Sequence, residues 1–232
     1  MIKQITAVQV EPPHISANEL AKYVFSTPAE KKEILRNQKF PPAYRVSYYA
    51  RALQAILASF HEGQYHETEL LQAAERIAAL PAKSKQEASK NKCNAEAVHH
   101  FCRLRELAIP PTGNHQFIRQ NAHLMREEVK ISIRPEIITS NLGEHFFAYT
   151  KLRFSKDKYS ADAAEIGLLL LLIYGHAQVQ PRIQFDIEKS KLIDCFSNSV
   201  IEGHRIPNYR QKQLDDALRE IASVWDQIKA RN

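Results

Sequence analysis

The feature that most constrains the fold is an uninterrupted apolar run, Ile166–Tyr174 (IGLLLLLIY), bounded by Glu165 and His176. A helix that spans a membrane needs about 20 consecutive apolar residues, and this run is much shorter. We therefore expect a helix from Ser160 to about Ala177 that is buried on nearly all sides and packs across a sheet.

Length and composition exclude several classes of protein. The 232 residues suffice for one domain of ordinary size, or two small ones, with a real core. Hydrophobic residues make up 44% and charged residues 25%, which argues against wholesale disorder, a collagen-like repeat and a polytopic membrane protein. Glycines number only 6, and the chain contains no P-loop, dinucleotide-binding fingerprint or serine nucleophile elbow. The net charge of +6 favours an acidic partner such as nucleic acid, although the excess is modest.

The cysteines and the first residues indicate the compartment. Cys93, Cys102 and Cys195 are too few, and odd in number, for a disulfide framework, so a reducing cytosol is expected. The first residues (MIKQITAVQVEPPHIS) lack the apolar stretch of a signal peptide. These features predict a cytoplasmic protein with no membrane partner.

The first half of the chain is predicted to be helical, because apolar residues recur at helical spacing and capping residues precede them. Ser16 and Thr27 are candidate N-caps, Pro28 suits a first turn, and Asn94 is a candidate cap for a later helix. The polar segment 83–92 is either a loop or a helix start. The predicted helices cover residues 18–26, 28–39, 44–61, 67–80 and 95–108.

The pattern then changes to the alternation of strands. From residue 129, apolar positions alternate with polar ones, as in a half-buried strand that continues through residue 138. A second strand over residues 144–154 is expected to form a hairpin with it. Further strands are expected at 182–187 and 192–196, before an amphipathic helix over 209–229. We predict an α+β fold in which a helical region, residues 1–125, packs on a small mixed sheet within residues 126–232.

Residues 126–200 resemble the core of the PD-(D/E)XK nuclease-like superfamily, most of all its RecB-type branch. The resemblance rests on Pro135-Glu136, on a strand that ends in Tyr149-Thr150-Lys151, and on the leucine-rich helix that follows. It implies a restriction-endonuclease-like β-β-α-β-β topology. In that superfamily, an acidic residue on one strand and an acid-x-Lys motif on the next hold Mg²⁺ and position a water. The resemblance therefore implies Glu136 and Lys151 as catalytic residues, with Glu136 as the metal ligand.

The motif is degenerate, because Tyr149 stands where the acid of acid-x-Lys belongs. Mg²⁺ prefers charged oxygen ligands, and a tyrosine with a pKa near 10 is uncharged at neutral pH. Glu144 would lie roughly 20 Å from Lys151 along an extended strand. Glu96 or Glu106 could supply a ligand, but nothing in the sequence marks them. We therefore expect no cofactor, and Mg²⁺ only if the protein is an active nuclease.

Two basic sets are candidates for contacts with nucleic acid. One lies on a single face of the second predicted helix, and the other lies on and around the predicted strands. A solvated face explains the first set equally well, because Glu30 and Glu33 are interleaved with it. The candidates are Lys32, Arg36, Lys39, Arg134, Arg153 and Lys156.

A group of cysteines and histidines invites a metal-site interpretation. Cys93, His99, His100 and Cys102 lie close together, but their spacing does not match that of a structural zinc site. We interpret Cys102 as a core residue and Cys195 as a buried thiol rather than a nucleophile.

The segment LAKYVFSTPAEKKEILRNQKFPPAYRVSYYARALQAI, with IRPEI and KLRFSK later, is similar to a group of bacterial proteins without an established activity. We predict a bacterial cytosolic protein of nuclease-like fold that binds nucleic acid, or serves in a DNA- or RNA-handling complex, without cutting. By analogy, mobile-element biology or phage defence would suit such a fold. Two alternatives stay open: an active Mg²⁺-dependent nuclease, and a protein-interaction subunit that docks through its helical half.

Overall fold

The computed structural model describes residues 12–41, 48–61, 64–109, 114–118, 121–141, 145–154, 156, 159–179 and 181–230. The helices are α1 (Ala17–Val24), α2 (Pro28–Lys39), α3 (Ala50–Ala58), α4 (Glu67–Ala78), α5 (Lys85–Ala108), α6 (Ser160–Ala177) and α7 (Tyr209–Val224), with 3₁₀ turns η1 (Gly203–Arg205) and η2 (Trp225–Gln227). The strands are β1 (His14–Ser16), β2 (Phe60–His61), β3 (Gln64–Tyr65), β4 (Asn114–Phe117), β5 (Ala122–Arg126), β6 (Val129–Ile133), β7 (Ile137–Asn141), β8 (Phe146–Arg153), β9 (Gln184–Phe185), β10 (Lys191–Asp194) and β11 (Ser199–Glu202).

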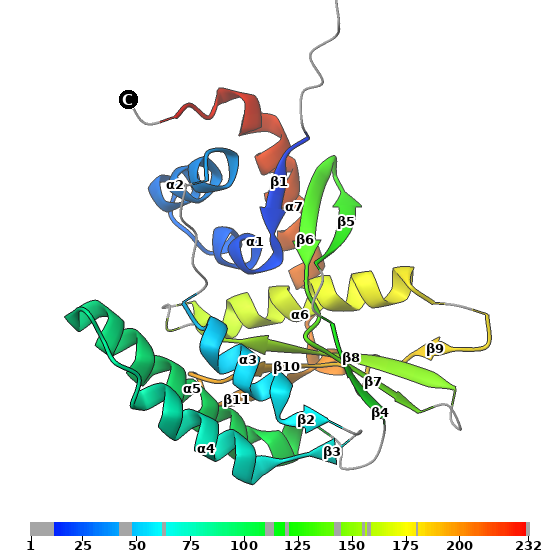
Figure 1. The fold of residues 1–232 in the computed structure, drawn as a ribbon. Helices are drawn as coiled ribbons and strands as arrows, with labels where there is room; N and C mark the ends of the chain where they lie inside the picture. Colours follow the sequence, from blue (N-terminus) through cyan, green and yellow to red (C-terminus); the bar gives the residue numbers. More distant parts are fainter. Residues whose placement is uncertain are drawn as a thin grey trace, which may run out of the picture.

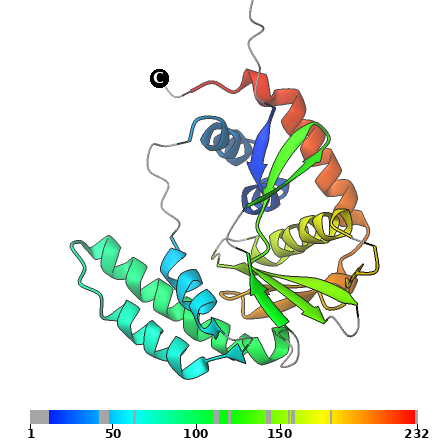
Figure 2. The ribbon, with the colours of Figure 1, turned by 45° about the vertical axis from the view of Figure 1, so that its right-hand side comes forward.

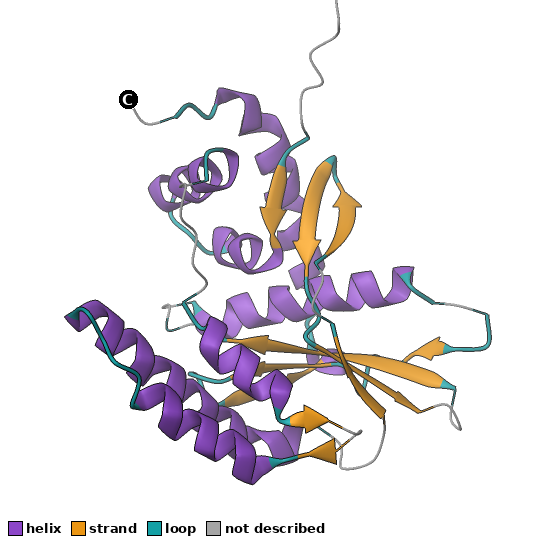
Figure 3. Ribbon diagram, in the orientation of Figure 1, coloured by secondary structure: helices purple, strands orange, loops and turns teal. Residues whose placement is uncertain are grey.

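These elements form an α+β fold with mixed sheets, as predicted (Figures 1 and 3). A large sheet lies between α6 on one face and α5 on the other. The turned view keeps α3, α4 and α5 on the opposite side of this sheet from α6 (Figure 2). A small sheet, with α1, α2 and α7 around it, lies beyond α6 (Figure 1).

The large sheet has the strand order β11-β10-β8-β7-β4, and β9 pairs with the start of β8. Strands β7 and β8 form the expected hairpin, whereas β10 runs parallel to β8. Parallel neighbours need a crossover connection, which α6 supplies between these two strands. The helix that the apolar run predicted therefore packs directly on the sheet, with Leu168, Leu170 and Leu171 fully buried.

The small sheet has the order β1-β6-β5. Val129, Ile131 and Ile133 of β6 are buried while Lys130 is exposed, which confirms the alternation read from the sequence. The prediction that this strand continues to residue 138 is wrong, because β6 ends at Ile133 and β7 belongs to the large sheet. Pro135 lies between them, and a proline has no N–H to donate to a continuous ladder.

The large sheet separates two apolar clusters. Tyr149 and Leu192 face the cluster that holds α1, α6 and α7. Leu152, three residues after Tyr149, and Ile193, directly after Leu192, face the cluster that holds α3, α4 and α5. Period-two alternation places neighbouring side chains on opposite faces of a sheet, so β8 and β10 contribute to both cores. Both clusters combine residues from before and after position 125.

The predicted caps of the first helices are present. The Ser16 hydroxyl accepts from the Glu19 N–H at 3.3 Å, and Thr27 and Glu30 form a capping box. Of the predicted helix over 44–61, α3 forms the middle, residues 42–47 lie outside the described residues, and 60–61 belong to β2.

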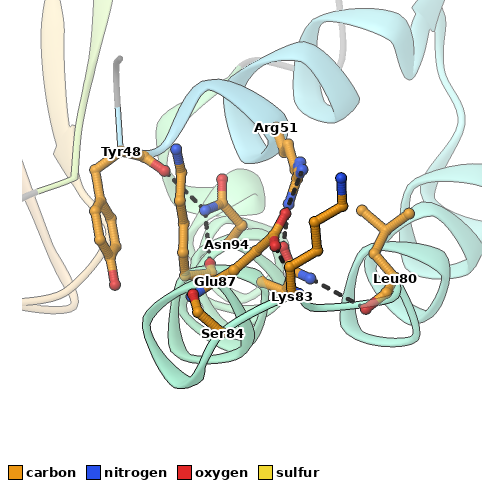
Figure 4. A network of polar contacts seen from close by, with 9 residues as sticks. Tyr48, Arg51, Leu80, Lys83, Ser84, Glu87 and Asn94 are labelled. Atoms are coloured by element: carbon orange, nitrogen blue, oxygen red, sulfur yellow. Dashed lines mark hydrogen bonds and ion pairs between the residues drawn. The ribbon is translucent and has the colours of Figure 1, made fainter. Parts of the chain in front are cut away.

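Helix α5 begins earlier than the expected cap at Asn94. Ser84 is the N-cap, since its hydroxyl accepts from the Glu87 N–H at 3.1 Å, so the polar segment before Asn94 forms the first turns of the helix. Asn94 is fully buried within α5. Its amide donates to the Tyr48 carbonyl at 2.9 Å (Figure 4). The amide oxygen accepts from the Ala52 N–H at 2.9 Å, so Asn94 fixes the start of α3 against α5.

Among the described residues, no helix combines the length and apolar character that crossing a bilayer requires.

Candidate site at the Glu136–Lys151 pair

The register of the β7–β8 hairpin brings Glu136 and Lys151 together. Glu136 directly precedes β7, and its N–H donates to the Thr150 carbonyl of β8 at 3.2 Å. The Lys151 Nζ lies 3.6 Å from the Glu136 Oε1. Both side chains are about 4% exposed, so the pair is almost completely withdrawn from solvent.

Both carboxylate oxygens of Glu136 are held by the protein. Oε1 lies 3.4 Å from the Arg134 Nε in addition to Lys151, and Oε2 accepts from the Leu152 N–H at 3.0 Å. Lys151 also donates to the Arg134 carbonyl at 3.1 Å. A buried carboxylate is tolerated when it is paired and hydrogen-bonded, as it is here.

Tyr149, at the place of the missing acid, packs in an aromatic cluster beneath α6. Its ring centroid lies 5.7 Å from the ring centroids of both Tyr174 and Phe185. Burial raises the pKa of Tyr149 to about 12, with a smaller contribution from Tyr174. The hydroxyl is therefore neutral under ordinary conditions and does not supply the charged oxygen that Mg²⁺ prefers.

The pair lies at the meeting point of two hollows. One, of about 210 Å³, is lined by Arg134, Glu136 and Lys151 together with the start of α1. The other, of about 430 Å³, shares Arg134 and Glu136 and is otherwise lined mainly by apolar side chains of α3. The Arg134 side chain is 40% exposed, so its guanidinium reaches solvent at the boundary between them.

The smaller hollow adjoins a third one. That hollow, of about 510 Å³, shares Ser16, Asn121 and Ser132 with it and adds the basic side chain of Lys130. The three hollows thus form a row that runs from the small sheet past Arg134 to α3. We call this row the Arg134 groove.

The residues at the pair do not fit a catalytic Mg²⁺ site. Glu136 is the single acidic side chain among the described residues that line these hollows. Its oxygens already meet two cations and a backbone N–H, whereas a Mg²⁺ site needs carboxylate oxygens directed at the metal. Two positive side chains and one carboxylate leave the cluster with a net single positive charge, which attracts an anion rather than a metal ion.

Of the other candidate ligands from the sequence, Glu96 lies on α5, away from the pair. Glu96 forms an ion pair with Lys156 at 3.5 Å. The side chain of Glu106 and the whole of Glu144 lie outside the described residues.

The six basic candidates do not form one surface. Arg134 lines the groove, but Arg153 is buried and pairs with Asp194 at 2.6 Å. The ammonium of Lys156 lies 4.4 Å from the Phe196 ring centroid, next to α5.

The cations of α2 contact the end of the chain. The Lys39 Nζ donates to the Trp225 carbonyl at 2.6 Å, and the Arg36 Nε donates to the Lys229 carbonyl at 3.3 Å. Lys32 is exposed. Positive side chains near the end of a helix stabilise its terminal carbonyls. Here Lys39 and Arg36 also hold the residues after α7 in place through their hydrogen bonds to the backbone.

Four polar residues of the small hollow were not recognised in the sequence. They are Ser16, Asn18, Asn121 and Ser132. The sequence marked Ser16 only as the N-cap of a helix. It marked Ser132 only as a residue on the polar face of a strand. The first turn of a helix carries a partial positive charge, but in α1 the Ser16 hydroxyl already accepts from the Glu19 N–H and the Glu19 carboxylate lies in the same turn, so Arg134 remains the main attraction for an anion.

Cys195 is a buried thiol, as interpreted from the sequence, whereas Cys102 is only partly buried and packs against the cluster that holds α3, α4 and α5. Burial raises the pKa of both Cys102 and Cys195 above the ordinary value for a thiol. The Tyr65 hydroxyl donates to the Cys102 Sγ at 3.5 Å. A thiol with a raised pKa is mostly protonated at neutral pH and is a poor nucleophile.

No protein-family model matches this chain, and a search of the curated proteins finds no match either.

Proposed function

We propose that the protein is a non-cleaving, nuclease-like protein that binds the phosphate backbone of nucleic acid in the Arg134 groove. The order of elements β7-β8-α6-β10 supports a nuclease-like topology. So does the placement of Glu136 before one strand and Lys151 on its neighbour, which matches the two strand positions of the nuclease motif.

One observation carries the proposal: the Glu136 carboxylate is neutralised by Lys151, Arg134 and the Leu152 N–H at the place where a nuclease would hold its metal. What faces the groove is the excess positive charge. Arg134 is well suited to phosphate, because its planar guanidinium donates several hydrogen bonds and stays charged at all ordinary pH values.

The lining of the groove suits an extended polyanion. Hydroxyl and amide groups of Ser16, Asn18, Asn121 and Ser132 lie beside the positive charges. Such groups commonly contact phosphate and sugar oxygens without reading the base sequence. The apolar hollow beneath α3 continues from Arg134 and could receive a base that follows a bound phosphate.

In this role the protein would act in a bacterial cytoplasm, within a complex that handles DNA or RNA, such as those of mobile elements or phage defence. The described cysteines are free thiols, which supports a reducing compartment.

Binding is expected to depend steeply on salt. Fluorescence anisotropy with single-stranded and double-stranded DNA and RNA should show affinity falling between about 50 and 200 mM salt, because bound phosphates release counterions. Arg134→Gln should weaken binding and reduce the slope of log K against log salt by about 1. The matched control is Arg205→Gln, which removes an exposed arginine that pairs with Glu202 outside the groove and should leave the slope unchanged.

Two outcomes would contradict this use of the groove. Equal slopes for Arg134→Gln and the parent, with a flatter slope for a combined Lys32, Arg36 and Lys39 replacement by glutamine, would place the binding on α2. Affinity that ignores salt and every variant would favour the protein-interaction subunit instead.

No cleavage is expected. The purified protein should leave single- and double-stranded DNA and RNA intact with Mg²⁺ or Mn²⁺, because a single neutralised carboxylate does not hold the metal that would activate water. The comparison is a Glu136→Ala, Lys151→Ala double variant on the same gel. Cleavage by the parent that the double variant loses would establish the active nuclease in place of this proposal.

A further inference from the structure

Two histidines and a glutamate come together at the junction of a short hairpin with a helix. His61 ends β2, His66 follows β3, and Glu69 lies in the first turn of α4. One ligand atom from each of the three lies within 4.8 Å of the other two, the single such group of three found among the described residues. The two imidazole rings are stacked, with their centroids 3.7 Å apart and their planes 4° from parallel.

His66 has a polar atom that the described residues leave unsatisfied. Its Nε2 is buried and has no hydrogen-bond partner among them. The side chain does not cap α4 either, although the backbone N–H of His66 donates to the Ser59 carbonyl at 2.7 Å. A buried ring nitrogen without a partner is uncommon in folded proteins and calls for a ligand, a water or an ion.

The neighbouring groups have the chemistry of a zinc site. The His61 Nε2 and the Glu69 Oε2 lie 3.1 Å apart. Two ligand atoms on a tetrahedral Zn²⁺ with bonds of about 2.0–2.2 Å lie roughly 3.3–3.6 Å apart, so this pair is already near the required spacing. Two imidazoles and a carboxylate are ligands that Zn²⁺ takes, with a fourth position left for water.

The stacked rings do not yet point at a common ion, because an imidazole binds a metal in the plane of its own ring. His61 and Glu69 have to turn toward the His66 Nε2, and their side chains are 43% and 57% exposed, which leaves space for that movement. His66 is partly buried and held by its backbone bond to Ser59, which makes it the fixed ligand. Only the two exposed ligands need to move.

We propose that His61, His66 and Glu69 bind a Zn²⁺ ion that fastens the β2–β3 hairpin to the start of α4. This site shares no residue with the Arg134 groove and does not depend on the proposed function. An ion bound by the folded chain raises its stability, so Zn²⁺ should raise the melting temperature.

The test is a titration of the full, metal-free chain with Zn²⁺ alone, followed by calorimetry. We expect one ion per chain. His61→Gln and Glu69→Gln should each weaken binding by about tenfold or more, since even loss of an outer-shell partner costs that much. Both residues are exposed, so these variants should keep the parent's circular dichroism. The matched control, His99→Gln, replaces an exposed histidine of α5 and should bind as the parent does.

Two further readouts test the coordination. Co²⁺ in place of Zn²⁺ should give the visible absorption of a four-coordinate ion in the parent and lose it in His61→Gln. Affinity should fall as the pH is lowered, because protons compete with the metal ion for the imidazole nitrogens. Absence of Zn²⁺ binding by the parent would overturn the proposal, as would equal affinity in the parent, His61→Gln and Glu69→Gln.

Discussion

The Leu171→Asp variant is expected to be unfolded at room temperature. Leu171 is fully buried in α6, within the cluster that joins α6 to the large sheet, α1 and α7. A carboxylate at this position has to be buried without a partner or protonated, and it also removes apolar contacts. The cost is about 5 kcal/mol or more, which is comparable with the whole stability of an ordinary domain.

Circular dichroism and urea unfolding measure this effect. Ala161→Asp is the matched control, because it places the same charge in the first turn of the same helix at an exposed position. An acid near a helix N-terminus is neutral to slightly stabilising, so the control should fold as the parent does. Leu171→Met keeps the volume and should cost less than about 1.5 kcal/mol. A melting temperature for Leu171→Asp equal to the parent's would contradict the core described for α6.

The Asp194→Ala variant is expected to lose about 3–5 kcal/mol of unfolding free energy. Asp194 is fully buried at the end of β10, opposite Arg153 in the parallel ladder, and accepts from the Arg153 Nη1 at 2.6 Å. Its other oxygen lies 3.3 Å from the N–H groups of Phe196 and Ser197, so the same carboxylate also shapes the turn after the strand. The Asp194→Ala substitution removes this carboxylate from the guanidinium of Arg153, whose side chain is only 7% exposed.

Two further variants separate the effect of the Asp194 charge from its hydrogen bonds to the turn. Asp194→Asn keeps an oxygen for the turn and loses the charge, so its loss of stability should be smaller than that of Asp194→Ala. An Arg153→Met, Asp194→Leu double variant leaves no charge buried at this position, and it should be more stable than Asp194→Ala alone. A single variant within about 0.5 kcal/mol of the parent, measured by urea unfolding, would show that the pair is not needed for folding.

Local patterns predicted most of the elements. The alternation through Val129, Ile131 and Ile133 and the apolar run of α6 both depend on which residues must leave water, and both elements formed as expected. Ser16 and Thr27 fixed two helix starts, because a cap depends on residues three positions apart. For the start of α5, the sequence allowed either a loop or a helix start over residues 83–92, because this polar segment has no apolar face; the structure shows the helix start, with Ser84 as the N-cap.

These local patterns did not predict which strands pair over long distances in the sequence. Strand β1 has only the residues His14–Ser16, and it exists because it pairs in parallel with β6, far along the chain. The division of the expected strand between two sheets has the same origin, because Ile133 and Ile137 enter different cores. A short segment carries no periodicity of its own, so only its partner strand decides its state.

For the site, the sequence determined which groups were available: one carboxylate at Glu136, a lysine at Lys151 and a tyrosine where a second acid would be. The tertiary structure decided what these groups can do. It buried Arg153 against Asp194, set Arg134 beside Glu136, and joined Ser16 and Asn121 to the same hollow. Electrostatic interactions depend on distance and on exclusion of water, and for residues far apart in the chain both are set only by the packing of the elements that carry them.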